Sequence, residues 1–112
     1  MKTIETMAAQ GDVLFRRIDV VPIGARPQKG ERHVVAHSET GHHHEAYGDG
    51  PPVCYFTTDD PMLSYLSCGA GGIVVEHLRP TDTHDPIRLA PGCWEVRRQR
   101  EHVPEGWRMV MD

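Results

Sequence analysis

Histidine is the residue type with the clearest chemical potential in this chain of 112 residues. Eight histidines are present, and five of them fall between residues 33 and 44. His42 and His44 are separated by one residue. In a β-strand, side chains at such positions point to the same face, about 6.6 Å apart along the strand. The spacing predicts that the two imidazoles turn toward a single ion, with His43 on the opposite face.

A metal site needs further ligands from elsewhere in the chain. His77 lies in an expected strand, and His84 lies in an expected loop at 81–85. Imidazole ligands suit zinc, iron, manganese, nickel and copper, and three histidines with an open coordination position are typical of a reactive site. We therefore expect a divalent transition metal as cofactor, zinc, iron, manganese or nickel, with its identity open. The candidate ligands are His42, His44, His77 and His84.

Carboxylates close to these histidines in sequence are expected to orient a ligand ring or to act on a metal-bound water. They are Glu45, Asp49, Glu76, Asp82 and Asp85. Two other interpretations stay open. The histidines can be polar residues of a solvated face or a subunit contact without any ion, or they can sense protons near their ordinary pKa of about 6.5.

The elements that must position these residues are short strands separated by turns rich in glycine and proline. No internal segment of ten or more residues has the apolar spacing of an amphipathic helix, although a short opening helix at 3–9 is an alternative. We expect an all-β fold, a small barrel or sandwich of about seven to nine short strands, with loops at 22–30 and 80–86. The expected strands are 13–18, 32–38, 42–47, 53–58, 62–68, 73–78, 93–101 and 107–111.

Length and composition indicate one domain over residues 1–112. A net charge of −4 argues against a protein that neutralises phosphates over a long footprint, so nucleic acid is not the expected partner. No apolar stretch is long enough to span a membrane and no secretory signal is visible, which predicts a cytoplasmic protein. Three cysteines without C-x-x-C spacing indicate neither a disulfide framework nor a zinc ribbon.

A second chemical feature is the arginine-rich strand that follows Pro91-Gly92. Alternation places Trp94, Val96, Arg98 and Arg100 on one face and Glu95, Arg97, Gln99 and Glu101 on the other. Guanidinium groups bind phosphates, so weak nucleotide or RNA binding through Arg97–Arg100 is one alternative. The interleaved glutamates favour cross-strand ion pairs or a subunit contact instead.

Two resemblances rest on these motifs. The H-x-H pair, followed by Asp49 after four intervening residues and by a later Pro91-Gly92 turn, resembles the metal motifs of cupins, which are small β-barrels that bind metal inside the barrel. The chain departs from that pattern at Ala36, where cupins have glycine, and after Pro91-Gly92, where no histidine follows closely.

The chain is more similar to a group of small uncharacterised microbial proteins. The shared segments are Gln10-Gly11-Asp12-Val13, Thr40-Gly41-His42-His43-His44, Leu89 to Val96 and Gln99-Arg100-Glu101. Tyrosine is usual in that group where this chain has His102. The resemblance implies a natural domain without supplying an activity.

We therefore expect the function of the protein to depend on its histidines. The hypothesis is a metal-binding β-domain; if it is an enzyme, the metal activates water or dioxygen on a small molecule or a phosphodiester. The competing hypothesis is a non-catalytic homo-oligomer, a structural or interaction module without metal, which associates through exposed strand edges and the region Arg97–Arg100.

Overall fold

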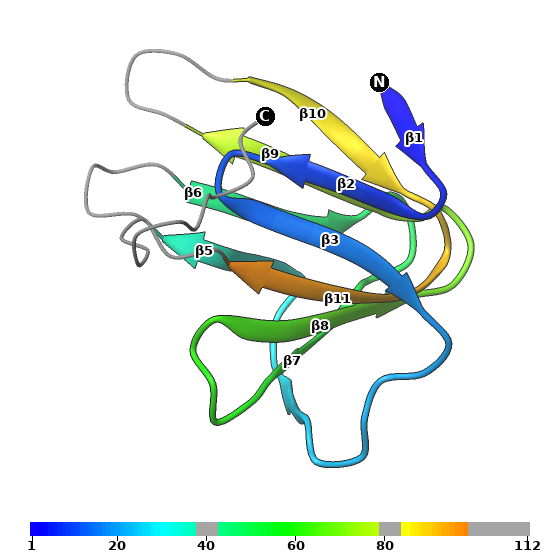
Figure 1. Ribbon diagram of the computed structural model, residues 1–112. Helices are drawn as coiled ribbons and strands as arrows, with labels where there is room; N and C mark the ends of the chain where they lie inside the picture. The colour runs from blue at the N-terminus through cyan, green and yellow to red at the C-terminus, as the bar shows by residue number, and fades with distance from the viewer. Residues whose placement is uncertain (38–42, 79–83, 99–112) are drawn as a thin grey trace, which may run out of the picture.

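The computed structural model describes residues 1–37, 43–78 and 84–98, with the backbone alone at residues 37, 78, 84 and 85. Within these ranges the chain forms eleven strands and no helix, so no described helix is long and apolar enough to cross a membrane. The strands make two sheets that face each other (Figure 1). The all-β class is confirmed, with a sandwich in place of a closed barrel and more strands than expected.

One sheet has five strands and the other has six. In spatial order the first contains β1 (Lys2–Ile4), β10 (His84–Leu89), β9 (Ile73–Leu78), β6 (His43–Gly48) and β5 (Arg32–His37). The second contains β2 (Met7–Gln10), β3 (Val13–Ile18), β11 (Gly92–Arg98), β8 (Leu63–Cys68), β7 (Cys54–Thr57) and β4 (Arg26–Gln28). Only β1 and β10 pair in parallel; the other described pairs are antiparallel.

The core lies between the sheets and follows from strand alternation. Phe15 and Trp94, from β3 and β11, are fully buried, as is Val75 from β9. Burying a side chain of this size stabilises the fold by about 1.5–3 kcal/mol. The indole Nε1 of Trp94 donates to the carbonyl of Ala90 at 2.8 Å, so its one polar group is satisfied. The core therefore fixes which residues of β3, β9 and β11 face inward.

Strand boundaries were predicted best where apolar runs end at clear turn residues. The expected strands 13–18 and 73–78 coincide with β3 and β9. The opening helix at 3–9 was wrong, because β1 and β2 occupy that segment. The loop expected at 22–30 contains β4, and the loop expected at 80–86 is wrong from residue 84 onward, where β10 begins. The strand expected at 107–111 lies outside the described residues.

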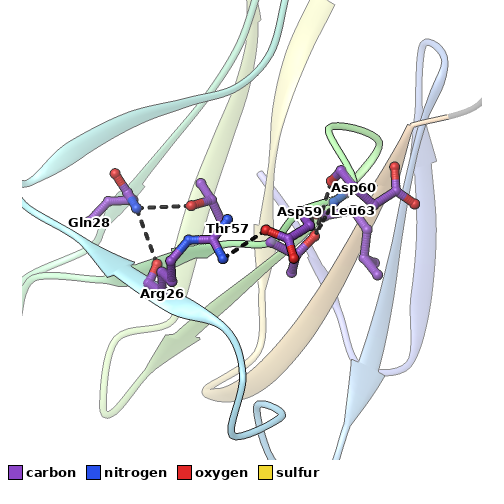
Figure 2. A network of polar contacts seen from close by, with 7 residues as sticks. Arg26, Gln28, Thr57, Asp59, Asp60 and Leu63 are labelled. Atoms are coloured by element: carbon purple, nitrogen blue, oxygen red, sulfur yellow. Dashed lines mark hydrogen bonds and ion pairs between the residues drawn. The ribbon is translucent and has the colours of Figure 1, made fainter.

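Strand β4 is a short edge strand attached to β7 by polar contacts (Figure 2). Arg26 forms an ion pair with Asp59 at 3.0 Å, and the Gln28 amide donates to the Thr57 hydroxyl at 2.9 Å. Pro27 between them lacks a backbone N–H, and proline in sheets is largely confined to edges. The proline and the short length of β4 explain why the sequence pattern predicts a loop at 22–30.

A bulge in β5 changes the facing of its residues. Val34 pairs with Glu45, but the next pair joins Ala36 to His44, so β5 has one extra residue. Both Val35 and Ala36 are buried as a result. In a regular strand Val34 and Ala36 would share one face, opposite Val35, and the bulge breaks this alternation. The bulge places Ala36 beside His44 in the ladder.

Candidate functional site

Two of the predicted site residues meet between the sheets. His44 of β6 and His77 of β9 are direct ladder partners, and each is only 2% exposed. Their rings stack with centroids 4.1 Å apart and planes at 16°. His43, the neighbour in sequence, is half-buried and alternates to the other face, as expected. His42 lies outside the described residues.

The backbone adds a third histidine position to this pair. His84 is the first residue of β10 and is the ladder partner of His77, so residues 44, 77 and 84 occupy one row across β6, β9 and β10. The prediction of His84 in a loop was wrong. In an antiparallel ladder, directly opposed residues belong to the same face of the sheet. The register therefore joins three predicted ligands that are far apart in sequence.

The turn between β2 and β3 covers the stacked rings. It consists of Gly11 and Asp12, and Gly11 has a φ of 61°, a conformation that favours glycine. A Cβ atom on Gly11 would lie 3.0 Å from Cε1 of His77 and 3.1 Å from Cε1 and Nε2 of His44. Glycine is thus required both by the turn and by the close approach of the rings.

Gln10 fixes the tautomer of His44. Its amide nitrogen donates to the carbonyl of Val75 at 3.2 Å, which directs its oxygen Oε1 to Nδ1 of His44 at 2.9 Å. An amide oxygen only accepts, so Nδ1 must carry the proton. In the neutral ring Nε2 then holds the lone pair. Such a hydrogen bond from the far nitrogen is what orients metal-binding histidines in general.

A carboxylate faces that lone pair. Oδ1 of Asp12 lies 3.8 Å from Nε2 of His44. The other oxygen, Oδ2, is buried and has no hydrogen-bond partner in the part of the chain that the structure describes. It lies 3.6 Å from the guanidinium of Arg98, at the end of β11, which is an ion-pair distance but not a hydrogen bond. The site therefore combines two electron-pair donors and one nearby cation.

The carboxylates predicted to serve the histidines lie elsewhere. Glu45 and Glu76 are ladder partners one residue away from His44 and His77, and alternation puts them on the outer face of the sheet. Arg32 bridges them, at 2.5 Å from Glu45 and 3.7 Å from Glu76. Their assignment to the histidine site was wrong, since the carboxylate beside His44 is that of Asp12.

The remaining predicted carboxylates give no support to the site either. Asp49 forms an ion pair with Arg88. Asp82 lies outside the described residues, and at Asp85 the backbone alone is described.

The outer carboxylates change the pKa of their neighbours. The phenol of Tyr47 donates to Glu76 at 2.6 Å, and this hydrogen bond, followed by desolvation and the charge of Glu76, raises the pKa of Tyr47. The guanidinium of Arg32 lies 3.9 Å above the Tyr47 ring, and its hydrogen bond to Glu45 is the main cause that raises the pKa of Arg32. These residues form a polar network separate from the histidines.

The arginine-rich strand carries the expected cross-strand ion pair. Arg16 of β3 is the ladder partner of Glu95 in β11 and contacts its carboxylate at 3.2 Å, while Arg97 approaches the same carboxylate at 3.6 Å. Gln99, Arg100 and Glu101 lie outside the described residues. Each described arginine of this strand thus lies beside a carboxylate.

Sequence reasoning missed Gln10, Asp12 and Arg98 as site residues. The segment Gln10 to Val13 was noted as a shared motif and Arg98 as sharing a face with Trp94, but neither was connected to the histidines. The connection depends on strand order, since β2, β3 and β11 belong to the sheet opposite β6 and β9. Among the described residues, no three histidine, cysteine or acidic side chains are already arranged around a common point.

Comparison with known proteins gives a family. The model of the family described as Domain of unknown function (DUF8820) matches residues 9–99. This chain belongs to that family. The matched range includes the β2–β3 turn, both stacked histidines and Arg98, so the whole described site lies inside the family domain. No curated protein and no solved structure matches the chain.

Proposed function

We propose that this protein binds one divalent transition metal ion at the inner edge of the His44 ring. The observation that carries the proposal is the approach of Asp12 Oδ1 to His44 Nε2 at 3.8 Å. Two ligand atoms of one tetrahedral zinc ion, each about 2.1 Å from the metal, lie roughly 3.4 Å apart. The spacing is therefore close to that of two ligands of one ion.

Electrostatics supports a cation at this point. Gln10 holds Nδ1 of His44 protonated, so in the neutral ring the lone pair is on Nε2, 3.8 Å from an oxygen of the Asp12 carboxylate. A cation placed near both atoms is attracted by both. Asp12 Oδ2, buried and lacking a hydrogen bond within the described chain, is a further donor atom for the same ion.

We propose His77 as a second ligand and His84, whose backbone is the ladder partner of His77, as a third. Because the rings of His44 and His77 are stacked and almost parallel, their nitrogen lone pairs lie in nearly parallel planes, so binding of one ion by both rings requires one ring to tilt. The ladder register of His84 with His77 supports its inclusion. His42, two residues before His44 and part of the cupin-like H-x-H pattern, is a fourth candidate ligand.

The burial of the site favours a structural ion over a reactive one. Both described rings are 2% exposed, and Gly11 lies against them. A catalytic metal needs an open position for water or substrate, whereas a structural metal is enclosed by protein ligands. When bound, such an ion would join the β2–β3 turn of one sheet to β6 and β9 of the other.

Metal titration tests the proposal. Protein purified without nickel resin and treated with a chelator is titrated with Zn²⁺, Mn²⁺, Fe²⁺ or Ni²⁺ by calorimetry, and its thermal unfolding is followed in parallel. We expect one ion per chain and a higher melting temperature, because a ligand that binds only the folded state stabilises it. The His44→Ala, His77→Ala double variant should lose both effects, and the His43→Ala control should keep them.

A milder variant protects this test from a folding failure. Asp12→Asn preserves the shape of the side chain and should weaken binding about 10- to 100-fold. Circular dichroism verifies that each variant is folded. No stoichiometric binding of any of the four metals by the folded wild-type chain would refute the proposal, and so would binding that His43→Ala abolishes as strongly as the double variant.

The arginines of β11 do not favour nucleic-acid binding as a second function. Arg97 and Arg98 lie beside Glu95 and Asp12, so their charges are partly neutralised within the fold.

A further inference from the structure

The turn between β2 and β3 encloses the His44 ring with three consecutive residues. Gln10 Oε1 lies 2.9 Å from Nδ1, Asp12 Oδ1 lies 3.8 Å from Nε2, and Gly11 lies against Cε1, the ring atom between the two nitrogens. The ring of His77 covers one face of His44, which is only 2% exposed. A hydrated metal ion is larger than a water molecule, so it cannot reach Nε2 in this conformation.

β2 is the part of this hairpin that the fold holds least. It lies at the edge of the six-stranded sheet and pairs with β3 alone (Figure 1). None of its four residues belongs to the core cluster of the described chain, whereas β3 contributes Val13 and Phe15 to that cluster and also pairs with β11. Segments with few buried apolar contacts open most readily. Separation of β2 from β3 therefore exposes His44 with little loss of core packing.

The start of β2 is fixed, so the turn is the end that moves. The backbone N–H of Arg17 donates to the carbonyl of Thr6 at 2.9 Å, just before β2 begins. Upstream of it, β1 pairs with β10 in the other sheet, and Ile4 of β1 packs against the core. The chain is thus anchored in both sheets as far as Thr6, and β2 with its turn is the length that can swing outward.

Polar contacts hold the turn in place. Gln10 donates to the carbonyl of Val75 at 3.2 Å and accepts from His44, and Asp12 lies 3.6 Å from the guanidinium of Arg98. When the turn moves out, water replaces these partners, so the net loss is modest. Asp12 moves with the turn, so opening exposes Nε2 of His44 and closing returns the carboxylate to it.

We infer that the β2–β3 hairpin is a strap over the metal site, in which β2 separates from β3 to admit the ion and closes again to bring Asp12 onto it. The inference rests on the proposed function and adds that a conformational step of the protein limits the capture of the ion. The observed rate of metal binding should therefore level off at high metal concentration. Release of the ion requires the same opening.

A reversible disulfide between the two strands tests the inference. Ala9 and Leu14 are ladder partners next to the turn, and because Val13 and Phe15 are buried, alternation directs Leu14 and its partner to the outer face. Cα atoms of such partners lie about 4.5–5.5 Å apart, which a disulfide spans. In the Ala9→Cys, Leu14→Cys variant, oxidation should lock β2 onto β3, and reduction should release it.

The first readout needs no metal. Diethyl pyrocarbonate modifies unprotonated ring nitrogens of histidine, and fragment-ion mass spectrometry follows each histidine separately, in chelator. Oxidation of the double variant should slow modification of His44 at least about tenfold, because the reagent reaches the ring only through local opening. His43, half-buried on the other face of β6, should react at the same rate in both forms.

The second readout is stopped-flow binding of Zn²⁺. The wild-type rate should reach a plateau as the Zn²⁺ concentration rises, and the plateau should be at least about tenfold lower in the oxidised double variant. Ser67→Cys is the matched control, because its ladder partners in β7 and β11 are Cys54 and Cys93, and a disulfide to either staples the same sheet away from the hairpin. The oxidised control should change neither rate.

Circular dichroism verifies that every variant is folded. Modification of His44 at equal rates in the oxidised and reduced double variant overturns the inference, because the ring would then be reached by another route. A Zn²⁺ binding rate that rises without a plateau, or slowing by the oxidised Ser67→Cys control, overturns it as well. The proposed function fails separately: if the folded wild-type chain binds no metal, the modification rates still decide whether the hairpin controls access to His44.

Discussion

Gly11 lies so close to His44 that a Cβ atom on the glycine would stand 3.1 Å from both Cε1 and Nε2 of the ring. The turn of one sheet is thus packed directly against a side chain of the other. The same ring lies beside Asp12 and is oriented by its hydrogen bond to Gln10. Small changes in the conformation of the turn should therefore change the position of the His44 ring.

Replacing Gly11 tests how tightly the turn is packed. Gly11→Ala should lower the free energy of unfolding by about 1–3 kcal/mol, because alanine is strained at a φ of 61° and its methyl group would press on two rings. Urea denaturation measures the change. Gly24→Ala is the control: no atom lies within 4 Å of its Cβ position, and the same substitution there should be neutral or slightly stabilising. Equal losses at both glycines would contradict the close packing described.

Replacing Gln10 tests the orientation of His44. Gln10→Leu leaves Nδ1 of His44 and the carbonyl of Val75 without their described partner, which should cost about 1–3 kcal/mol of stability. If the metal proposal holds, affinity for the ion should also fall about 10- to 100-fold. Gln28→Leu also removes a hydrogen bond, but from an exposed edge strand, so it is the comparison and should cost less than Gln10→Leu, at most about 1 kcal/mol. Unchanged stability in Gln10→Leu would mean that the hydrogen-bonded chain does not hold the ring.

Replacing Arg98 tests whether a cation binds beside Asp12. The guanidinium lies 3.6 Å from the Asp12 carboxylate and repels any metal ion bound there. Arg98→Gln should therefore tighten metal binding about tenfold, which corresponds to about 1.4 kcal/mol. Arg97→Gln, next in the chain but paired with Glu95 on the other face, should leave the affinity unchanged. Weaker metal binding by Arg98→Gln would contradict this prediction and would mean that Arg98 helps to position the Asp12 carboxylate.

The sequence predicted the strands better than it predicted the site. Runs such as 73–78 are rich in β-branched residues and end at glycine or a polar loop, so local pattern suffices. β10 was missed because His84-Asp85-Pro86 has the composition of a turn, while its strand character comes from pairing with β1 and β9. Local propensity cannot reveal such tertiary pairing.

The site depends on register, which no local pattern contains. His44 and His77 are brought together by pairing of β6 with β9, and Asp12 reaches them only because the two sheets pack face to face. One error was avoidable. The alternation that places His42 and His44 on one face also places Glu45 on the other, and the same holds for Glu76 beside His77.

The network on the outer face of the five-stranded sheet gives a pH-dependent prediction. The hydrogen bond from Tyr47 to Glu76 raises the pKa of the phenol above its ordinary value of about 10. The folded chain therefore holds this proton at a pH where the unfolded chain has lost it. The stability that the interaction contributes is complete below about pH 10 and is lost as the pH rises through the folded-state pKa.

Tyrosinate absorbance measured during an alkaline titration tests this prediction residue by residue. The chain has three tyrosines, and Tyr47→Phe should remove a component that titrates above the ordinary range. Glu76→Gln keeps a side-chain oxygen as acceptor but removes the negative charge, so the pKa of Tyr47 should fall toward its ordinary value. Because the raised pKa has a local cause, Tyr55→Phe should leave the high-pH component in place. A wild-type titration in which all three phenols ionise together near the ordinary pKa would show that the Tyr47–Glu76 hydrogen bond does not form in solution.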